Sequence, residues 1–217
     1  METKILLTAV SYKPYGACLA GIKADGTFIR PLSHSHPDFS VPWKSIEVGP
    51  GGRKLQPLDV VTLELETIRE HQARHFEDRY CTNAQISYVN HLTMSDLEDH
   101  AGFRTAAKPA WFMAEGKPYV VDAPSTRASL ALVLAESVEI TPKPHDPAKH
   151  YISFTTGKRR FQNLSLTDLN HLQLSASVDP DTEYWLCLSL ALDWVEHGEI
   201  HNYKLVAGMW PANVVQK

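Results

Sequence analysis

Residues Gly16 to Ser33 read GACLAGIKADGTFIRPLS and constrain the fold more than any other stretch of the chain. Two apolar runs are separated by Asp25-Gly26, a pair typical of tight β-hairpin turns because glycine adopts a positive φ without steric cost. The second run ends at Arg30-Pro31, where the proline removes a backbone donor and keeps the preceding residue extended. The pattern predicts a β-hairpin from which Arg30 projects at a defined point.

The remainder of the chain also favours strands over helices. A second strand-turn-strand pattern, YISFTTGKRRFQNLSLTD, begins at Tyr151, and apolar runs such as LDVVTLELETI and EYWLCLSLAL follow the two hairpins. Residues 33–57 are expected to form a long loop, and TPKPHDPAKH a rigid connector. Helices are expected at about 69–117, where NAQISYVNHL and TMSDLEDHAGF are each predicted to form one. The repeated order of elements predicts a mainly β protein with two small barrels in tandem.

Composition limits the classes of protein to which the chain can belong. Its 217 residues, 43% of them hydrophobic, suffice for one large domain or two small ones. The formal charge of -4 gives no overall attraction to nucleic acid, so a polyanion would have to meet a local basic patch. No apolar window reaches the length of a membrane span, and the first residues lack the pattern of a signal peptide. Cys18, Cys81 and Cys187 are odd in number and far apart, which indicates free thiols and a cytoplasmic protein.

Four segments, CLAGIKADGTFIRPLS, HFEDRY, LSLTD and NYKLVAG, follow one another in the chain. Together they resemble the dual OB-containing domain, a bacterial module of two consecutive OB folds, from about Lys4 to Met209. Phe28 departs from the pattern, since that family typically has a tryptophan there. The resemblance implies two tandem OB-like β-barrels, the first in residues 1–128 with a small helical insertion at about 69–117, and the second in residues 129–217. It also implies a nucleic-acid-binding or nucleotide-sensing component of a bacterial defence system.

OB barrels commonly bind single strands across one face, with aromatic platforms for the bases and cations for the phosphates. The GKRR turn of the second hairpin presents three cations within a stretch, 149–166, that has no acidic residue. Phe154, Phe161 and Tyr151 lie in the same hairpin and are candidates for base stacking. The residues expected to contact nucleic acid or a nucleotide are Lys23, Arg30, His34, His36, Lys158, Arg159 and Arg160.

Each of these candidates also has a plain structural interpretation. The GKRR turn is equally well explained as a solvated surface turn. Strand aromatics usually face the core, which is the favoured place for Phe154 and Phe161. Arg30 is either a ligand contact or the partner of an internal acid such as Asp25, Asp59, Glu77 or Asp78, and the internal pair is slightly favoured.

The 11 histidines require a check for metal and catalytic sites. His71 and His75 are spaced i, i+4 and, with Glu77 and Asp78 close by, are weak candidates for a metal site. The chain has no HExxH, CxxC or GxSxG motif, and the Gly-rich GPGGRK stretch lacks the ending of a phosphate loop. No catalytic set is visible, and no cofactor is expected.

The sequence therefore predicts a binding protein rather than an enzyme. The expected partner is nucleic acid, single-stranded rather than duplex, or a nucleotide-like ligand; no membrane partner is expected. One alternative is a protein-interaction or scaffold module that docks a partner effector. A less favoured alternative is a metal-dependent hydrolase that uses His71 and His75.

Overall fold

The computed structural model describes residues 2–66, 75–107, 111–114, 117–121, 128–170, 178–191, 194–196 and 198–212. The chain divides into two compact units, Met1–Ala107 and Lys108–Lys217. The division lies ahead of the boundary that the sequence places at 128/129, because Phe112 and Met113 pack into the core of the second unit. Within the described residues, no helix has the length and apolar character needed to cross a membrane.

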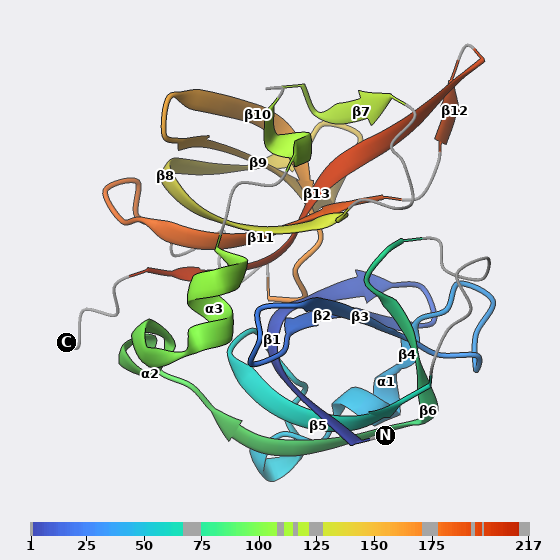
Figure 1. Cartoon of the computed structure of the whole chain (residues 1–217). Coiled ribbons are helices and arrows are strands. Elements are labelled where there is room, and N and C mark those ends of the chain that lie inside the picture. Colours follow the sequence, from blue (N-terminus) through green and yellow to red (C-terminus); the bar gives the residue numbers. More distant parts are fainter. Residues whose placement is uncertain are drawn as a thin grey trace. The chain divides into compact units, whose positions relative to one another are not determined.

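The first unit is a closed β-barrel of five strands. Around the barrel the strands follow the order β1-β2-β3-β6-β5, and β5 pairs with β1 to close it. All pairs are antiparallel except β3 with β6, which is parallel. The strands are β1 (Glu2–Lys13), β2 (Gly16–Ile22), β3 (Phe28–Leu32), β5 (Asp59–Leu65) and β6 (Asp78–His91), with the short β4 (Val41–Pro42) added to β2 (Figure 1).

The second unit repeats this plan. Its barrel follows the order β8-β9-β10-β13-β11 and closes on β8, and β10 with β13 is again the parallel pair. The two barrels thus share one five-strand topology, which confirms the predicted tandem OB-like fold. The strands are β8 (Leu130–Lys143), β9 (Asp146–Thr156), β10 (Arg159–Leu166), β11 (Tyr184–Leu190) and β13 (Glu199–Pro211), with β7 (Tyr119–Val121) and β12 (Trp194–Glu196) paired to β13.

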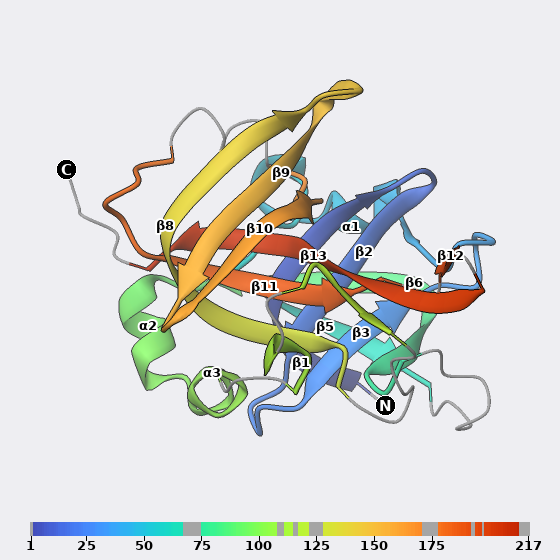
Figure 2. The same cartoon turned by 90° about the horizontal axis from the view of Figure 1, so that it is seen from above.

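Both predicted hairpins are present. Gly26 (φ 83°) makes the turn between β2 and β3, and Gly157 (φ 57°) makes the turn between β9 and β10, so each glycine has the positive φ that its turn requires. The prediction that TPKPHDPAKH forms a rigid connector was wrong, because these residues lie in a third hairpin. β8 continues to Lys143 and β9 begins at Asp146, which makes β8 and β9 a long hairpin that extends past β10 (Figure 2).

The helical elements are short and differ in part from expectation. NAQISYVNHL is not a helix but lies in β6, where Ile86 is buried beside Leu63 of β5; pairing and burial override its helical appearance. TMSDLEDHAGF is helical as predicted, but it forms two helices that break at His100, and the second continues past Gly102 to Ala106. Thr93 caps the first of them through a capping box. The helical elements are α1 (Trp43–Ile46), η1 (Pro50–Gly52), α2 (Met94–Asp99), α3 (Ala101–Ala106) and η3 (Trp111–Ala114).

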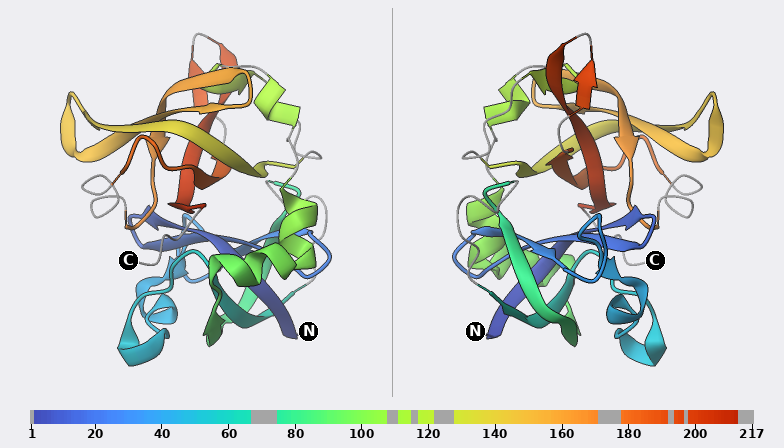
Figure 3. Two further views of the ribbon diagram at one scale, coloured as in Figure 1. Left: turned by 90° about the vertical axis from the view of Figure 1, so that its left-hand side faces the viewer. Right: turned by 90° about the vertical axis from the view of Figure 1, so that its right-hand side faces the viewer.

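The helix α3 packs on the turn that follows β2. The backbone of Gly102 lies so close to the Lys23 carbonyl that a Cβ at this position would collide with it. Figure 3 shows the two green helices, α2 and α3, beside the strands of the first barrel. The predicted long loop at 33–57 contains β4, α1 and η1, so it is a folded connection between β3 and β5.

Candidate nucleic-acid interface

Arg30 is an internal residue of the first barrel. Its side chain is only 6% exposed, and its guanidinium Nη1 lies 3.4 Å from Oδ1 of Asp78, the first residue of β6. The backbone N–H of Arg30 also donates to the carbonyl of Glu77 at 2.9 Å. The internal salt bridge is therefore what the structure contains, and Arg30 joins β3 to β6 instead of presenting a cation to a ligand.

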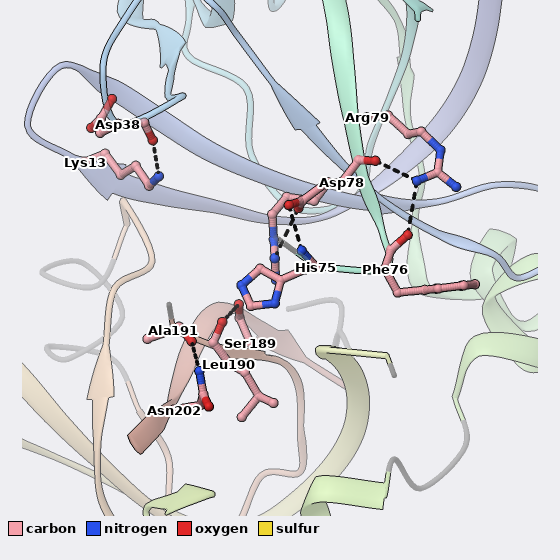
Figure 4. Close-up of polar contacts among 11 residues, drawn as sticks. Lys13, Asp38, His75, Phe76, Asp78, Arg79, Ser189, Leu190, Ala191 and Asn202 are labelled. Atoms are coloured by element: carbon pink, nitrogen blue, oxygen red, sulfur yellow. Dashed lines mark hydrogen bonds and ion pairs between the residues drawn. The ribbon is translucent and has the colours of Figure 1, made fainter. Parts of the chain in front are cut away.

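The same carboxylate organises the start of β6. The second oxygen of Asp78 accepts a hydrogen bond from the backbone N–H of His75 at 2.9 Å. Next to it, the Arg79 guanidinium donates to the carbonyls of Phe76 and Asp78 (Figure 4). Asp78 thus has a structural role, and no metal-binding role is needed to explain its position.

Lys23 is occupied by a local ion pair at the β2–β3 turn. Its Nζ lies 3.1 Å from Asp25 Oδ2. Hydrogen bonds from Thr27 and from Lys23 lower the pKa of Asp25 to about 2. Because α3 packs on this turn, Lys23 is less available to a ligand than the hairpin pattern suggests.

The two predicted histidines take part in ring stacking on the first unit. The exposed His34 stacks on Tyr80 of β6, with ring centroids 3.7 Å apart, and Phe39 meets the same tyrosine at 6.0 Å. His36 stacks on Tyr15 of the β1–β2 turn at 5.8 Å. The segment after β3 therefore carries aromatic rings toward two other elements of the barrel.

A further ring pair lies at the end of β1. Tyr12 and Trp43 have ring centroids 5.8 Å apart, and Trp43 begins α1. Tyr12 is 59% exposed and Tyr15 is 54% exposed, which is unusual for side chains of this size. These rings form three groups, Tyr12 with Trp43, Tyr15 with His36, and Tyr80 with His34 and Phe39, and we use the name ring surface for the three groups taken together.

Two lysines border the ring surface. Lys13 Nζ donates to the carbonyl of Asp38 at 2.7 Å, which ties the β1–β2 turn to the segment that carries His34 and His36 (Figure 4). Lys54 Nζ lies 4.8 Å from the centroid of the Trp43 ring, a cation–π distance. Positive charge and exposed rings therefore occur together on this part of the barrel.

A buried carboxylate fixes the segment that carries Lys54. Asp59 is fully buried and accepts two hydrogen bonds from Arg53, each 2.7 Å long. It also accepts from the backbone N–H of Gln56 at 2.9 Å and lies 2.9 Å from His91 Nδ1. The hydrogen bonds with Asp59 raise the pKa of Arg53 above its ordinary value. This network holds the chain between η1 and β5 in one conformation.

In the second barrel the predicted cations of the β9–β10 turn are all exposed. Arg159 donates to the carbonyl of Met113 at 2.9 Å, and Arg160 lies 3.9 Å from Glu139, an exposed and therefore weak pair. Lys158 makes no ion pair or hydrogen bond with the described part of the chain. The turn thus offers Lys158 and the partly engaged Arg160 to solvent.

Phe154 and Phe161 are core residues. They are 1% and 0% exposed, and their rings stack on each other with centroids 5.2 Å apart. The structural interpretation of these two aromatics is confirmed. Tyr151, on the outer face of β9, is half-buried and remains available on one side.

Of the two weak metal candidates, His75 is among the residues that the structure describes and His71 lies outside them. Among the described ranges, no group of three or more His, Cys, Asp or Glu side chains is arranged to hold a metal ion. The backbone of His75 serves to position Asp78.

Sequence reasoning did not select the tyrosines and the tryptophan of the ring surface. The YKPYG stretch contained a usable signal, because Tyr12 and Tyr15 flank a Lys-Pro pair directly after an apolar strand. Trp43 and Tyr80 had no local signal, since each meets its partner ring only through the barrel topology.

The model of the dual OB-containing domain family matches residues 3–209 of the chain. A comparison with curated proteins found no match.

Proposed function

The chain belongs to the dual OB-containing domain family, and from this premise we propose that it binds single-stranded nucleic acid through the ring surface of its first barrel. The observation that carries the proposal is the exposure of Tyr12 and Tyr15 at the β1–β2 turn. OB barrels bind oligonucleotides with the loop between their first two strands, which is the place of this turn. Unpaired bases stack on exposed rings, whereas the bases of a duplex are already stacked and paired.

The role of each group follows from its chemistry. Tyr12 and Tyr15 present ring faces to bases, and each is supported from behind by a second ring, Trp43 or His36. The ammonium groups of Lys13 and Lys54 attract the phosphates between the bases. The Lys13–Asp38 and Arg53–Asp59 contacts hold the surrounding chain before a ligand arrives, which lowers the entropic cost of binding.

The residues expected from the sequence keep different places in this proposal. His34 and His36 belong to the binding surface, and Lys158, Arg159 and Arg160 serve as an additional phosphate contact on the second barrel. Arg30 and Lys23 are assigned structural roles, because their charged groups already have acidic partners. We further propose a cytoplasmic protein of a bacterial defence system, a setting that rests on the family resemblance and on the three free thiols.

The test is fluorescence anisotropy with labelled single-stranded RNA, single-stranded DNA and duplex DNA at low and moderate salt. We expect both single strands to bind more tightly than the duplex. Replacing Tyr12 or Tyr15 by alanine removes a stacking platform that contributes about 1–3 kcal/mol, so each variant should bind about 5- to 150-fold more weakly. Tyr12→Phe and Tyr15→Phe keep the ring and should bind like the unchanged chain.

Single strands that bind no better than the duplex, or alanine variants that match their phenylalanine controls, would show that the rings contact no bases.

A second candidate function, protein docking, is favoured by a different observation. Val195 and Ile200 pair across the β12–β13 hairpin and are 68% and 38% exposed. Apolar side chains at an exposed hairpin are typical of protein contacts. If the chain binds no oligonucleotide but retains a partner protein, and Val195→Asp together with Ile200→Asp releases that partner, this function replaces the first.

A further inference from the structure

The two barrels carry a Lys-Pro pair followed by a residue with a ring at the turn between their first and second strands. In the first barrel β1 ends at Lys13, and Pro14-Tyr15 forms the turn. In the second barrel β8 ends at Lys143, and Pro144-His145 forms the turn. The first pair beyond the turn is also the same, because Lys13 pairs with Gly16 and Lys143 pairs with Asp146, three residues later in each case. Beyond that pair the second hairpin has a bulge on β9, since Pro142 pairs with His150, whereas the first hairpin continues regularly there.

The surroundings of the two lysines also correspond. Both lysines are half-buried, and in both turns the proline and the following ring are exposed. Lys13 Nζ donates to the carbonyl of Asp38, after β3, and Lys143 Nζ donates to Ser165 Oγ on β10; both distances are 2.7 Å. Lys143 is thus held by the third strand of its barrel, and Lys13 by the segment that follows the third strand of its own.

The turn of the second barrel opens onto a polar face. Tyr151 of β9 pairs with Thr141 of β8 and Ser165 of β10, so these three side chains form one row. Their neighbours along the strands, such as Ile152 and Leu164, point into the core, which places the row on the outer face. Lys143 Nζ lies 4.7 Å from the centroid of the Tyr151 ring on this face.

A second lysine lies close to the first. Lys149 lies in the bulge of β9 between the Lys143–Asp146 and Pro142–His150 pairs, directly after the turn. Its side chain is 66% exposed. Burial and the nearby Lys149 ammonium lower the pKa of Lys143 below its ordinary value. Two ammonium groups that repel each other are stabilised when an anion lies between them.

We infer that the β8–β9 turn of the second unit is a second ligand site, at which Lys143 and Lys149 hold a phosphate group beside the ring of Tyr151. The ammonium group of Lys143 already lies against one side of the Tyr151 ring. A second ring, that of His145, lies in the turn itself. Contacts to phosphate therefore contribute more to binding at this site than contacts to bases. At the ring surface of the first barrel, contacts to bases contribute more. As a nucleic-acid contact the second site rests on the proposed function; as a phosphate site it stands independently.

The residue after the ring also differs between the two turns. Asp146 occupies the position of Gly16, and its carboxylate lies 2.9 Å from Lys149 Nζ. The hydrogen bond from Lys149 lowers the pKa of Asp146, so the carboxylate is charged at neutral pH. It competes with a phosphate for Lys149, and its removal should strengthen binding.

The first test is an amide NMR titration of the full chain with sodium pyrophosphate. We expect the largest shifts at residues 143–151, their loss in the Lys143→Gln, Lys149→Gln double variant, and their retention in Lys4→Gln. Lys4 is an exposed lysine at the far end of β1, and its variant controls for the loss of an exposed lysine elsewhere on the chain. Asp146→Asn should bind pyrophosphate about two- to fivefold more tightly, the range of an exposed ion pair.

Amide shift changes at 143–151 that are no larger than those around Lys4, or that persist in the double variant, would refute the proposed phosphate site. Weaker binding by Asp146→Asn would also count against it, because a carboxylate that competes with phosphate cannot assist its binding.

The second test separates free phosphate from nucleic acid. Binding of a labelled 20-nucleotide oligo(dT) is measured at several salt concentrations, and the slope of log Kd against log salt is compared between variants. Losing two phosphate contacts lowers the slope by about 1.4, since each contact to a single strand contributes about 0.7. The double lysine variant should show this fall, whereas Tyr12→Ala with Tyr15→Ala should weaken binding and keep the slope.

The two proposals can fail separately. An unchanged slope in the double lysine variant, with weaker binding by the tyrosine variants, would overturn the second site as a nucleic-acid contact and leave the proposed function intact. Pyrophosphate binding at 143–151 without any oligonucleotide binding would refute the proposed function and support a site for free phosphate.

Discussion

Asp59→Asn should destabilise the first barrel without changing the shape of its core. Asp59 is fully buried, and its carboxylate lies within hydrogen-bond distance of four nitrogen atoms. Two of them are Nη1 and Nη2 of Arg53. Asparagine is nearly isosteric but uncharged, so it leaves the guanidinium without its counter-charge. Breaking a buried ion pair typically costs about 3–5 kcal/mol. Because the Arg53 side chain is 32% exposed and recovers some hydration, we expect about 2–3 kcal/mol here.

The assay must report on the first unit by itself. Four of the five tryptophans lie in the second unit, so tryptophan fluorescence is dominated by the wrong barrel. Hydrogen exchange under increasing urea, read by mass spectrometry on peptides from β1 and β5, gives the unfolding free energy of the first barrel. The matched control is Asp25→Asn, which removes the exposed pair with Lys23 and should cost at most about 1 kcal/mol. If Asp59→Asn loses no more stability than Asp25→Asn, the Asp59 network does not hold this barrel together.

Two further predictions follow from pKa shifts. The folded pKa of Asp25, about 2, lies below its ordinary value of 3.8. Its contribution to stability is therefore fully present above pH 4 and lost as the pH falls toward 2. The difference between the unchanged chain and Asp25→Asn in the urea midpoint of the first barrel, read on the same β1 and β5 peptides, should shrink over that range, and a constant difference would contradict the assignment. Burial, together with Glu66 and Glu64, raises the pKa of the Cys81 thiol to about 11, so iodoacetamide at pH 8 should label the partly exposed Cys18 well before Cys81, as read by mass spectrometry. Equal labelling of the two would show that Cys81 is not shielded.

The fold was predictable where local pattern and barrel topology agree. The Asp25-Gly26 and Gly157 turns, each with a positive φ, marked two hairpins correctly. The segment NAQISYVNHL was assigned to a helix because its apolar residues are also spaced for one. Its place in β6 depends on pairing with β5, a contact between residues distant in sequence that no local pattern reveals.

The candidate site was less accessible to sequence reasoning. Charge drew attention to Arg30, yet an arginine that is buried against Asp78 has the same local sequence as one that faces a ligand. The ring surface joins the β1–β2 turn, the segment after β3 and the start of β6, and these meet only through the barrel. The correspondence of the two Lys-Pro turns likewise became visible only when the strands placed both lysines at the last position before the turn.

The most direct test of the central claim is to locate a bound single strand on the protein. The full chain is photo-cross-linked to an oligonucleotide that contains 4-thiouridine, and the attached peptides are identified by mass spectrometry. The account predicts cross-links in the peptides that contain Tyr12, Tyr15 and Trp43, with attachment lost in Tyr12→Ala and Tyr15→Ala. Cross-links that fall elsewhere and persist in both alanine variants would contradict it.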